Sequence, residues 1–284
     1  MTLPFTVACL QLNAGNEIGP NIEGTRRLAL EARRAGADFI LTPENTTCIE
    51  PRRDLVLAKA RSEQDHPAIS AFQALAAEMG AWLLIGSLTI KLDESQCANR
   101  CYLFDPAGRI AARYDKIHMF DVDLAHGERY RESATFRPGR QAVTADLPWG
   151  RLGLSICYDL RFAHLYRALA QAGSDFLSIP SAFTRPTGQA HWHVLMRARA
   201  IETGCYVFAP AQTGEHAGGR KTYGHSLIVA PWGEVLADGG EEVGFVTARI
   251  DPAKVAEARA MIPALTHDRG FAPPPGERLL AAGE

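Results

Sequence analysis

Strand-like and helix-like segments alternate along most of this chain, and this alternation is what most constrains its fold. Residues 5–12 (FTVACLQL) alternate as a half-buried strand does, residues 21–37 carry alanine and leucine at helical spacing, and residues 38–44 (DFILTPE) form a second apolar run. This is a βαβ opening. The same pattern returns later, with helices expected at 66–80, 162–173 and 189–204 and strands expected at 81–90, 175–183 and 205–212. The pattern predicts an α/β protein whose mixed sheets are covered by helices.

The chain is expected to form a single domain over residues 1–265. Proline and glycine at 104–110, 147–152 and 230–235 indicate tight reversals between apolar runs. No stretch rich in glycine, serine or charge separates two halves of the sequence. Residues 266–284 lose their periodicity and gain prolines, so we expect this C-terminal tail to lie on the surface or against a partner subunit.

The charge balance limits the kinds of partner that this chain can have. Its 30 basic and 32 acidic residues give a formal charge of -2, so no overall positive field is present to hold nucleic acid or an anionic membrane. The sequence has no basic segment followed by a long apolar one, and no run of about 18 uncharged apolar residues. Six cysteines are too few for a disulfide scaffold and fit a reducing compartment. We therefore expect a soluble, cytoplasmic protein that acts on a small molecule.

Metal and cofactor sites are not expected. Cys97 and Cys101 have a C-x3-C spacing without a second half, which is a weak zinc motif. His191 and His193 lie two residues apart in an expected helix, where their side chains would point in different directions and could not easily share an ion. The glycine-containing stretches at 14–19 and 215–224 match neither nucleotide-binding fingerprint.

Cys157 is the cysteine whose position suggests chemistry. A buried free cysteine usually serves as a small apolar side chain, and Cys9, Cys101 and Cys205 fit that description. In residues 151–162 (RLGLSICYDLRF), however, the apolar strand stops at Cys157 and polar residues follow at once. The thiol is thus expected at the carboxyl edge of a sheet, before a helix whose first N–H groups can face an anion. This location favours a nucleophile.

Glu44 and Lys116 occupy similar positions in the sequence. Glu44 directly follows an apolar strand, where a poorly solvated carboxylate can exchange protons near neutral pH. Lys116 lies in a similar run, ARYDKIHMFD. Taken singly, a helix-capping or surface acid and a solvated strand charge would explain these two residues equally well.

Taken together, the three segments resemble the carbon–nitrogen hydrolase (nitrilase) superfamily. The glutamate motif appears as LTPEN, the lysine motif as YDKIHMFDVDL and the cysteine motif as GLSICYDLRF, in the order of that family. The resemblance extends from the first strand to about residue 265. Residues 180–214 and 223–240 are most similar to the Nit amidase branch, and within it to the deaminated glutathione amidase type.

The resemblance implies a fold, an assembly and roles for particular residues. The fold would be an α-β-β-α sandwich, and homodimers or higher homo-oligomers would pair its helical faces. Glu44 would be the general base, Cys157 the nucleophile, and Lys116 with the Tyr158 backbone N–H the stabilisers of the oxyanion. Glu132, in RYRESATFRPG, would hold Lys116 charged and help to position the substrate, with Glu128 as the nearby alternative.

Neighbouring polar residues receive structural interpretations. We expect Asp159 and Arg161 to form a charge pair that fixes the turn behind the nucleophile. His118 suggests a Cys-His dyad, but the carboxylate base of the family makes this dyad unnecessary. Two departures from the family pattern, His164 after the cysteine motif and His193 where relatives have a glutamate, concern substrate fit and subunit contacts.

The expected activity is hydrolysis of a linear amide without a metal or organic cofactor. The resemblance implies a small substrate that bears a carboxylate, such as deaminated glutathione or α-ketoglutaramate. Ser181, Thr184, Arg185 and Thr187 follow the next strand and are expected to bind that carboxylate from a loop. Other branches of the superfamily, including nitrilases, N-carbamoyl amino acid hydrolases and acyltransferases, remain alternatives. An inactive binding scaffold is a further alternative, although such proteins would be expected to lose one of the three motif residues.

Overall fold

Two six-stranded sheets form the centre of the protein. The computed structural model describes residues 3–124 and 129–272. The first sheet has the order β16-β1-β2-β3-β4-β5, with bounds Gly244–Ile250, Phe5–Gln11, Phe39–Leu41, Trp82–Lys91, Cys97–Phe104 and Ile110–Asp115. The second has the order β15-β14-β11-β10-β9-β8, with bounds Val235–Asp238, Leu227–Val229, Tyr206–Ala209, Phe176–Ser178, Gly150–Leu154 and Val143–Leu147.

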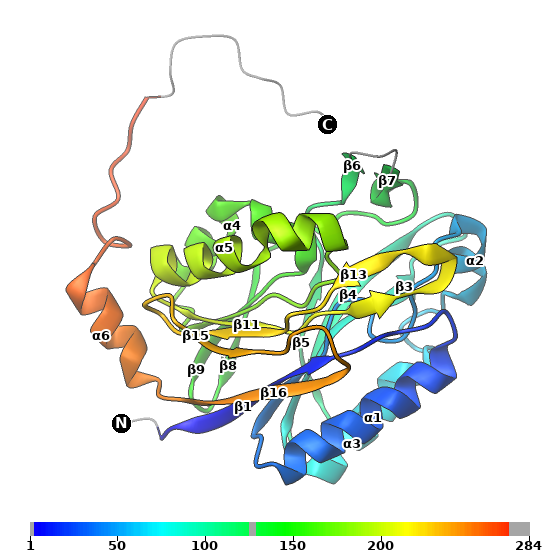
Figure 1. The fold of residues 1–284 in the computed structure, drawn as a ribbon, viewed down its shortest axis with the longest axis horizontal. Coiled ribbons are helices and arrows are strands. Elements are labelled where there is room, and N and C mark those ends of the chain that lie inside the picture. The colour runs from blue at the N-terminus through cyan, green and yellow to red at the C-terminus, as the bar shows by residue number, and fades with distance from the viewer. Residues whose placement is uncertain (1–2, 125–128, 273–284) are drawn as a thin grey trace.

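Helices cover the outer face of each sheet, so the layers run α-β-β-α (Figure 1). Helices α1 (Ile18–Arg34) and α3 (Pro67–Met79) pack on the first sheet, and α4 (Ala163–Gln171) and α5 (Arg185–Thr203) pack on the second. The described residues also form α2 (Arg53–Lys59) and α6 (Ala253–Met261). This arrangement confirms the expected α/β class and its sandwich of sheets and helices.

The alternation within β1 explains why this layered arrangement is stable. Val7 and Cys9 join the core between the two sheets, whereas Ala8 and Leu10 join the core under α1 and α3. Because successive side chains of a strand point to opposite faces, one apolar strand can bury both faces at once. β1 pairs in parallel with β2 and in antiparallel fashion with β16, so the first and last strands lie side by side.

Several short elements complete the fold around the ends of the strands. Two small hairpins pair β6 (Asp121–Asp123) with β7 (Arg129–Arg131), and β12 (Thr213–Glu215) with β13 (Lys221–Tyr223). Single turns of 3-10 helix lie at η2 (Glu132–Ala134), η3 (Cys157–Arg161) and η4 (Ala217–Gly219). The three reversals predicted from proline and glycine are present as the β4–β5, β8–β9 and β14–β15 hairpins.

Helix α5 begins earlier than the sequence pattern predicted. It starts at Arg185 instead of residue 189, with Pro186 in its first turn, where a missing N–H costs nothing. Arg185 and Thr187 therefore lie in a helix, and the prediction that they lie in a loop is wrong. The start of this helix faces the candidate site described below.

The tail is described only in part. Residues 266–272 are exposed, and Asp268 accepts hydrogen bonds from Arg167 and Gln171 of α4. Residues 273–284 lie outside the described part, so the role of the tail stays a prediction. Among the helices that the structure describes, none combines the length and the apolar character needed to cross a membrane.

Candidate active site

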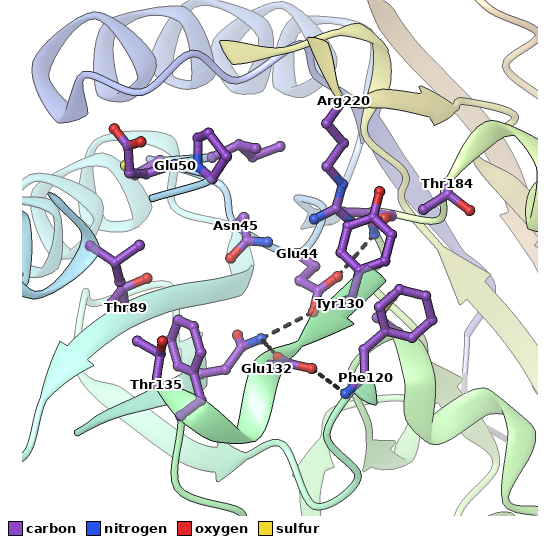
Figure 2. A pocket seen from close by; sticks show the side chains of 18 of the residues that line it. Glu44, Asn45, Glu50, Thr89, Phe120, Tyr130, Glu132, Thr135, Thr184 and Arg220 are labelled. Atoms are coloured by element: carbon purple, nitrogen blue, oxygen red, sulfur yellow. Dashed lines mark hydrogen bonds between the residues drawn. The ribbon is translucent and has the colours of Figure 1, made fainter. Parts of the chain in front are cut away.

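A cavity of about 850 Å³ opens at one edge of both sheets. It is lined by Glu44 after β2, Asn99 in β4, Lys116 after β5 and Cys157 after β9. Figure 2 shows Glu44 and Glu132 in this cavity together with Tyr130 and Arg220. The carboxyl ends of the parallel strands β2 and β9 thus bring residues from distant parts of the chain to one place.

Cys157 occupies an unusual backbone conformation where β9 ends. Its φ is +49°, a left-handed backbone conformation that residues other than glycine adopt only at a cost in free energy. Its N–H donates to the carbonyl of Pro180 (2.9 Å), and Asp159 accepts from the N–H of Ile156 (2.9 Å). These bonds hold the turn, so that the thiol lines the cavity although only 7% of the residue is exposed.

Glu44 is buried beside the thiol and is fixed by several donors. Its Oε1 accepts from Lys116 Nζ (2.8 Å) and from Asn99 Nδ2 (3.0 Å), and its Oε2 accepts from the N–H of Ala182 (3.1 Å). The thiol of Cys157 is a further hydrogen-bonding partner of this carboxylate. The carboxylate therefore has one fixed orientation next to the group from which it would take a proton.

Lys116 is shared between two carboxylates. Besides the bond to Glu44, its Nζ donates to both oxygens of Glu132, at 3.0 and 2.8 Å. Glu132 is held in turn by the N–H of Phe120 (2.6 Å) and by Asn99 Nδ2 (3.1 Å). The structure thus brings together the four residues predicted from the motifs. Glu128, the alternative to Glu132, lies outside the described residues.

The electrostatics of these groups define the resting state of the site. Burial alone would raise the pKa of Glu44, but the charge of Lys116 and hydrogen bonds from Lys116 and Cys157 hold that pKa below its ordinary value. Burial, and then the charge of Glu44, raises the pKa of Cys157 well above the ordinary thiol range. Burial opposes the charge of Lys116, yet Glu132 and Glu44 raise its pKa overall. At neutral pH the site therefore holds a carboxylate, a neutral thiol and an ammonium.

The expected charge pair between Asp159 and Arg161 is wrong. The buried carboxylate of Asp159 accepts from Tyr114 Oη (2.6 Å) and is paired with His118 Nδ1 (2.7 Å). Arg161 instead lies over the ring of Phe183, 5.4 Å from its centroid. Asp159 still fixes the turn behind Cys157, but it does so through neutral donors and a histidine.

His118 is occupied by this structural network. Its ring stacks on Phe162 with centroids 3.5 Å apart, and its Nδ1 contacts Asp159. It is not among the described residues that line the cavity, whereas Tyr158, whose N–H was predicted to stabilise the oxyanion, is one of them. A Cys-His dyad therefore has no support in this geometry.

Of the residues predicted to bind a substrate carboxylate, some line the cavity and one does not. Thr184 and Arg185 line the cavity, and Arg185 is paired with Glu241 (2.8 Å) at an exposed position. Ser181 is buried, and its hydroxyl donates to the carbonyl of Ile179 (3.0 Å). Ser181 does not belong to the described lining of the cavity, so we do not assign it a substrate contact.

Arg220 was missed by the sequence interpretation. It precedes β13, its Nη2 donates to the carbonyl of Ala182 (2.6 Å), and its guanidinium lies over the ring of Tyr130, 5.3 Å from the centroid. Its Nε is buried and has no hydrogen-bond partner among the described residues. Its charge helps to lower the pKa of Glu44, although the charge and hydrogen bond of Lys116 act more strongly. No feature of the segment EHAGGRKTYG indicated this position, because a loop arginine is usually solvated.

Asn99 was also missed, because it lies within a strand whose other residues are mostly apolar. Its Nδ2 bridges the two carboxylates of Glu44 and Glu132. It therefore keeps these acids at a fixed separation around Lys116. A polar residue facing inward from a buried strand is the only sequence feature that could have suggested this role.

The cavity as a whole carries positive charge. Its described lining includes nine basic and three acidic side chains, and each of the three acids, Glu44, Glu50 and Glu132, is paired with a lysine of the same lining. Arg53, Arg161 and Arg220 have no carboxylate partner among the described residues. The cavity is therefore suited to a ligand that brings its own negative charge.

Comparisons with known proteins show the family to which this chain belongs. The family described as "Carbon-nitrogen hydrolase" matches residues 6–260. The chain is 38% identical over 274 residues to the deaminated glutathione amidase of Yersinia enterocolitica, covering 93% of this chain and 92% of the relative.

Solved structures show the same similarity. The Caenorhabditis elegans NitFhit protein superposes with a TM-score of 0.86 at 36% identity, covering 94% of this chain and 66% of that one. A mutant of the amidase from Nesterenkonia sp. AN1 superposes with a TM-score of 0.77 at 26% identity, covering 91% of this chain and 98% of that one. That structure is described as showing the result of Michael addition of acrylamide at the active-site cysteine.

Proposed function

Because this chain belongs to the carbon–nitrogen hydrolase family, within the nitrilase superfamily, we propose that it cleaves a small carboxylate-bearing amide through a thioester on Cys157. The chain is an enzyme that hydrolyses carbon–nitrogen bonds other than peptide bonds, as its family and its amidase-named relatives establish. The observation that supports the proposal is the burial of Glu44, Lys116 and Cys157 against one another in a cavity of positive charge.

The first half of the reaction forms the thioester. Glu44 takes the thiol proton while the sulfur of Cys157 bonds to the amide carbon, because the raised pKa of the thiol prevents it from ionising in advance. The carbonyl oxygen becomes an oxyanion, which Lys116 and the N–H of Tyr158 stabilise. Glu44 then gives its proton to the nitrogen, the carbon–nitrogen bond breaks and ammonia or an amine leaves.

The second half restores the enzyme. Glu44 takes a proton from a water molecule whose oxygen attacks the thioester carbon, and the carbon–sulfur bond breaks. The proton returns to the sulfur of Cys157, and the carboxylic acid product leaves. Glu132 does not exchange protons in this scheme. It holds Lys116 in its charged form and in place, as its two hydrogen bonds to Nζ indicate.

We propose that Arg220 binds the carboxylate of the substrate. Arg185 is paired with Glu241 at the exposed side of the cavity, whereas Arg220 has no carboxylate partner among the described residues and is bonded to the same Ala182 that donates to Glu44. Arginine binds a carboxylate with two parallel hydrogen bonds, which fixes orientation as well as charge. Thr184 lines the same cavity and offers a hydroxyl.

The proposed substrates are amides with an α-keto acid at one end, such as α-ketoglutaramate or deaminated glutathione. The relative from Yersinia enterocolitica is named for the second of these compounds. The direct test is to measure kcat/KM of the purified enzyme for these two amides, an uncharged amide of equal length, a nitrile and an N-carbamoyl amino acid. We expect the α-keto acid amides to be hydrolysed fastest.

If the enzyme belonged to another branch of the family, a different compound of the same substrate panel would be hydrolysed fastest. Preference for the nitrile would indicate a nitrilase, and preference for the carbamoyl compound would indicate a carbamoyl amino acid hydrolase. Activity with none of the compounds would support an inactive scaffold. Any of these three results would contradict the proposed substrate class.

We further propose that the enzyme is a homodimer. Large apolar side chains are exposed on α5 and beside α6: Val194 is 69%, Ile201 is 53%, Trp232 is 49% and Ile262 is 57% exposed. Ile201, Trp232 and Ile262 line one small hollow, so this apolar surface is continuous. A continuous exposed apolar patch favours contact with a second protein, and a second copy is what the resemblance of this chain implies. Light scattering should give twice the chain mass, and an Ile201→Glu variant should give the mass of one chain.

The proposed compartment is the cytoplasm. All six cysteines of the chain are free, and Cys157 must stay reduced to act as a nucleophile. Fractionation of cells that express the tagged protein would test this assignment.

A further inference from the structure

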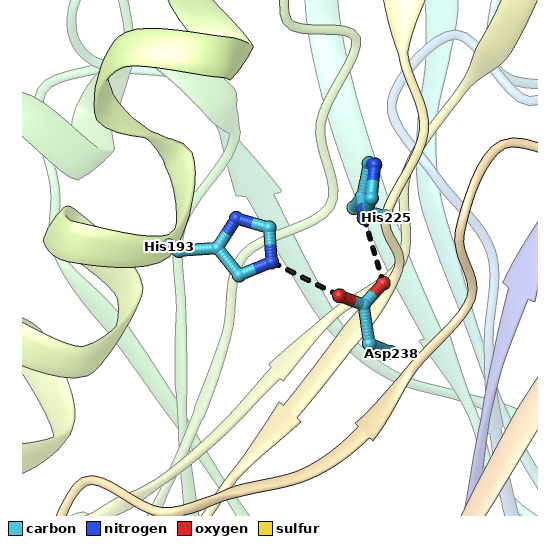
Figure 3. A group of neighbouring side chains, drawn as sticks. All are labelled: His193, His225 and Asp238. Carbon is cyan, nitrogen blue, oxygen red and sulfur yellow. Dashed lines mark hydrogen bonds and ion pairs between the residues drawn. The ribbon is translucent and has the colours of Figure 1, made fainter.

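Three side chains outside the cavity converge at the surface between α5 and the second sheet. His193 lies in the middle of α5, His225 lies two residues before the start of β14, and Asp238 ends β15 (Figure 3). None of the three belongs to the described lining of the cavity.

The geometry of the group brings three potential ligands to one point. His193 Nε2 lies 3.0 Å from Asp238 Oδ2, and His225 Nδ1 lies 2.8 Å from Asp238 Oδ1. One ligand atom from each residue lies within 4.8 Å of the others. In Figure 3 the carboxylate of Asp238 faces both imidazole rings. The three side chains are partly exposed, by 22 to 35%, so an ion could reach them from solvent.

The protein holds two of these groups in place. The carbonyl of His225 accepts from Trp192 Nε1 (2.7 Å), and its N–H donates to the carbonyl of Gly240 (2.6 Å). The N–H of Gly240 donates to Asp238 Oδ1 (2.9 Å). The ring of His225 also stacks on Tyr223, with centroids 4.4 Å apart. His193 extends from α5 toward the carboxylate of Asp238 and completes the group.

We propose that His193, His225 and Asp238 bind a divalent transition-metal ion of the zinc type. Neutral imidazoles and one carboxylate are ligands that Zn²⁺ accepts, and a water molecule would complete a four-coordinate site at the surface. Ligand atoms on a tetrahedral ion are about 3.3 Å apart when the bonds are about 2.0–2.1 Å long. The two histidine–aspartate pairs would therefore open by a few tenths of an ångström when the ion replaces the direct hydrogen bonds.

The ion would have a structural effect and would not enter the reaction. It would join α5 to the hairpin of β14 and β15, and the first turn of α5 lines the cavity through Arg185 and Thr187. A ligand that binds only the folded state stabilises that state according to its concentration and affinity. Zinc should thus raise the melting temperature without being needed for hydrolysis.

Binding is measured by calorimetry with Zn²⁺ in a Cys157→Ala background, which removes the cavity thiol as a competing ligand. We expect one ion per chain at this site. His193→Gln should weaken its binding at least about tenfold, because a ligand is lost. His191→Gln is the matched control: it lies on the same helix, contacts Arg161 instead of Asp238, and should leave binding unchanged. Circular dichroism checks that each variant is folded.

A second variant shows whether weaker binding results from the loss of a ligand or from a folding defect of the first variant. Asp238→Asn removes the negative charge and should lower the affinity as His193→Gln does, and added Zn²⁺ should raise the melting temperature of the parent chain but of neither variant. The proposal is overturned if the parent binds no Zn²⁺ saturably, or if His193→Gln binds it as tightly as His191→Gln. In either case the three residues form only a hydrogen-bonded contact between α5 and the sheet.

Discussion

The ammonium of Lys116 lies 2.8 Å from the carboxylate of Glu44, and both residues are almost completely buried. Lys116 is also bonded to Glu132, so two buried carboxylates share one buried cation. Burial of the nearby thiol, and then the negative charge of Glu44, raises the pKa of Cys157. Proton transfer from Cys157 to Glu44 is therefore expected to accompany attack on the substrate.

Loss of Lys116 should abolish most of the activity. Lys116→Met removes an oxyanion donor and should lower kcat by at least about a hundredfold. Lys59 is the matched control, since it lines the same cavity and is paired with Glu50, and Lys59→Met should retain a kcat within a few fold. Steady-state kinetics with circular dichroism checks this prediction. Equal kcat values in the two variants would show that Lys116 is misassigned.

The Cys157 thiol should remain protonated in the resting enzyme. Because burial and the charge of Glu44 raise its pKa, its thiolate should not form through the ordinary thiol range, up to about pH 8.5. The ultraviolet thiolate absorbance of the wild type minus that of Cys157→Ala, measured against pH, gives this titration directly. A thiolate signal at neutral pH would mean that the charge of Lys116 outweighs burial.

Arg220 should determine the preference for a charged substrate. Arg220→Ala should raise KM for α-ketoglutaramate at least about tenfold and should affect an uncharged amide of the same length far less, because an ion pair with the substrate is lost. The control variant is Arg185→Ala, which removes a cation that is already paired with Glu241 and should change KM for the charged substrate less. A larger selective effect in Arg185→Ala would transfer the role of receptor to Arg185.

Asp159 should be important for stability. It is fully buried and accepts from Tyr114, His118 and the N–H of Ile156, so Asp159→Ala leaves these donors unsatisfied. We expect the free energy of unfolding to fall by about 3 kcal/mol. Asp146→Ala, which breaks only an exposed pair with Arg151, should change it by less than about 1 kcal/mol. Urea denaturation of both variants measures the difference, and similar losses would contradict this role of Asp159.

The sequence predicted the helices, the strands and the motif residues better than it predicted which side chains contact one another. Glu44 and Cys157 each follow an apolar run, whereas Lys116 follows a strand of mixed polarity, and only the resemblance to a family assigned the three residues to one site. Their convergence requires that β2 and β9 end at the same edge, which depends on the packing of two sheets and cannot be obtained from periodicity.

The residues that were missed depend on contacts between distant segments. Arg220 reaches the cavity because the β12–β13 hairpin brings it next to Ala182, 38 residues away in the chain. Asp159 was assigned to its sequence neighbour Arg161, but the fold supplies Tyr114 and His118 from another strand and its following loop. Closeness in the sequence therefore favoured an ion pair between Asp159 and Arg161, whereas in the fold Asp159 contacts Tyr114 and His118.

The most direct test of the central claim compares two cysteines that line the same cavity, Cys157 and Cys48. Each is replaced by alanine, and kcat/KM for α-ketoglutaramate is measured for both variants and the wild type. We expect Cys157→Ala to lose at least about a thousandfold, because no nucleophile remains to form the thioester, and Cys48→Ala to stay within a few fold of the wild type. Hydrolysis by Cys157→Ala at a rate near that of the wild type would contradict the proposed mechanism.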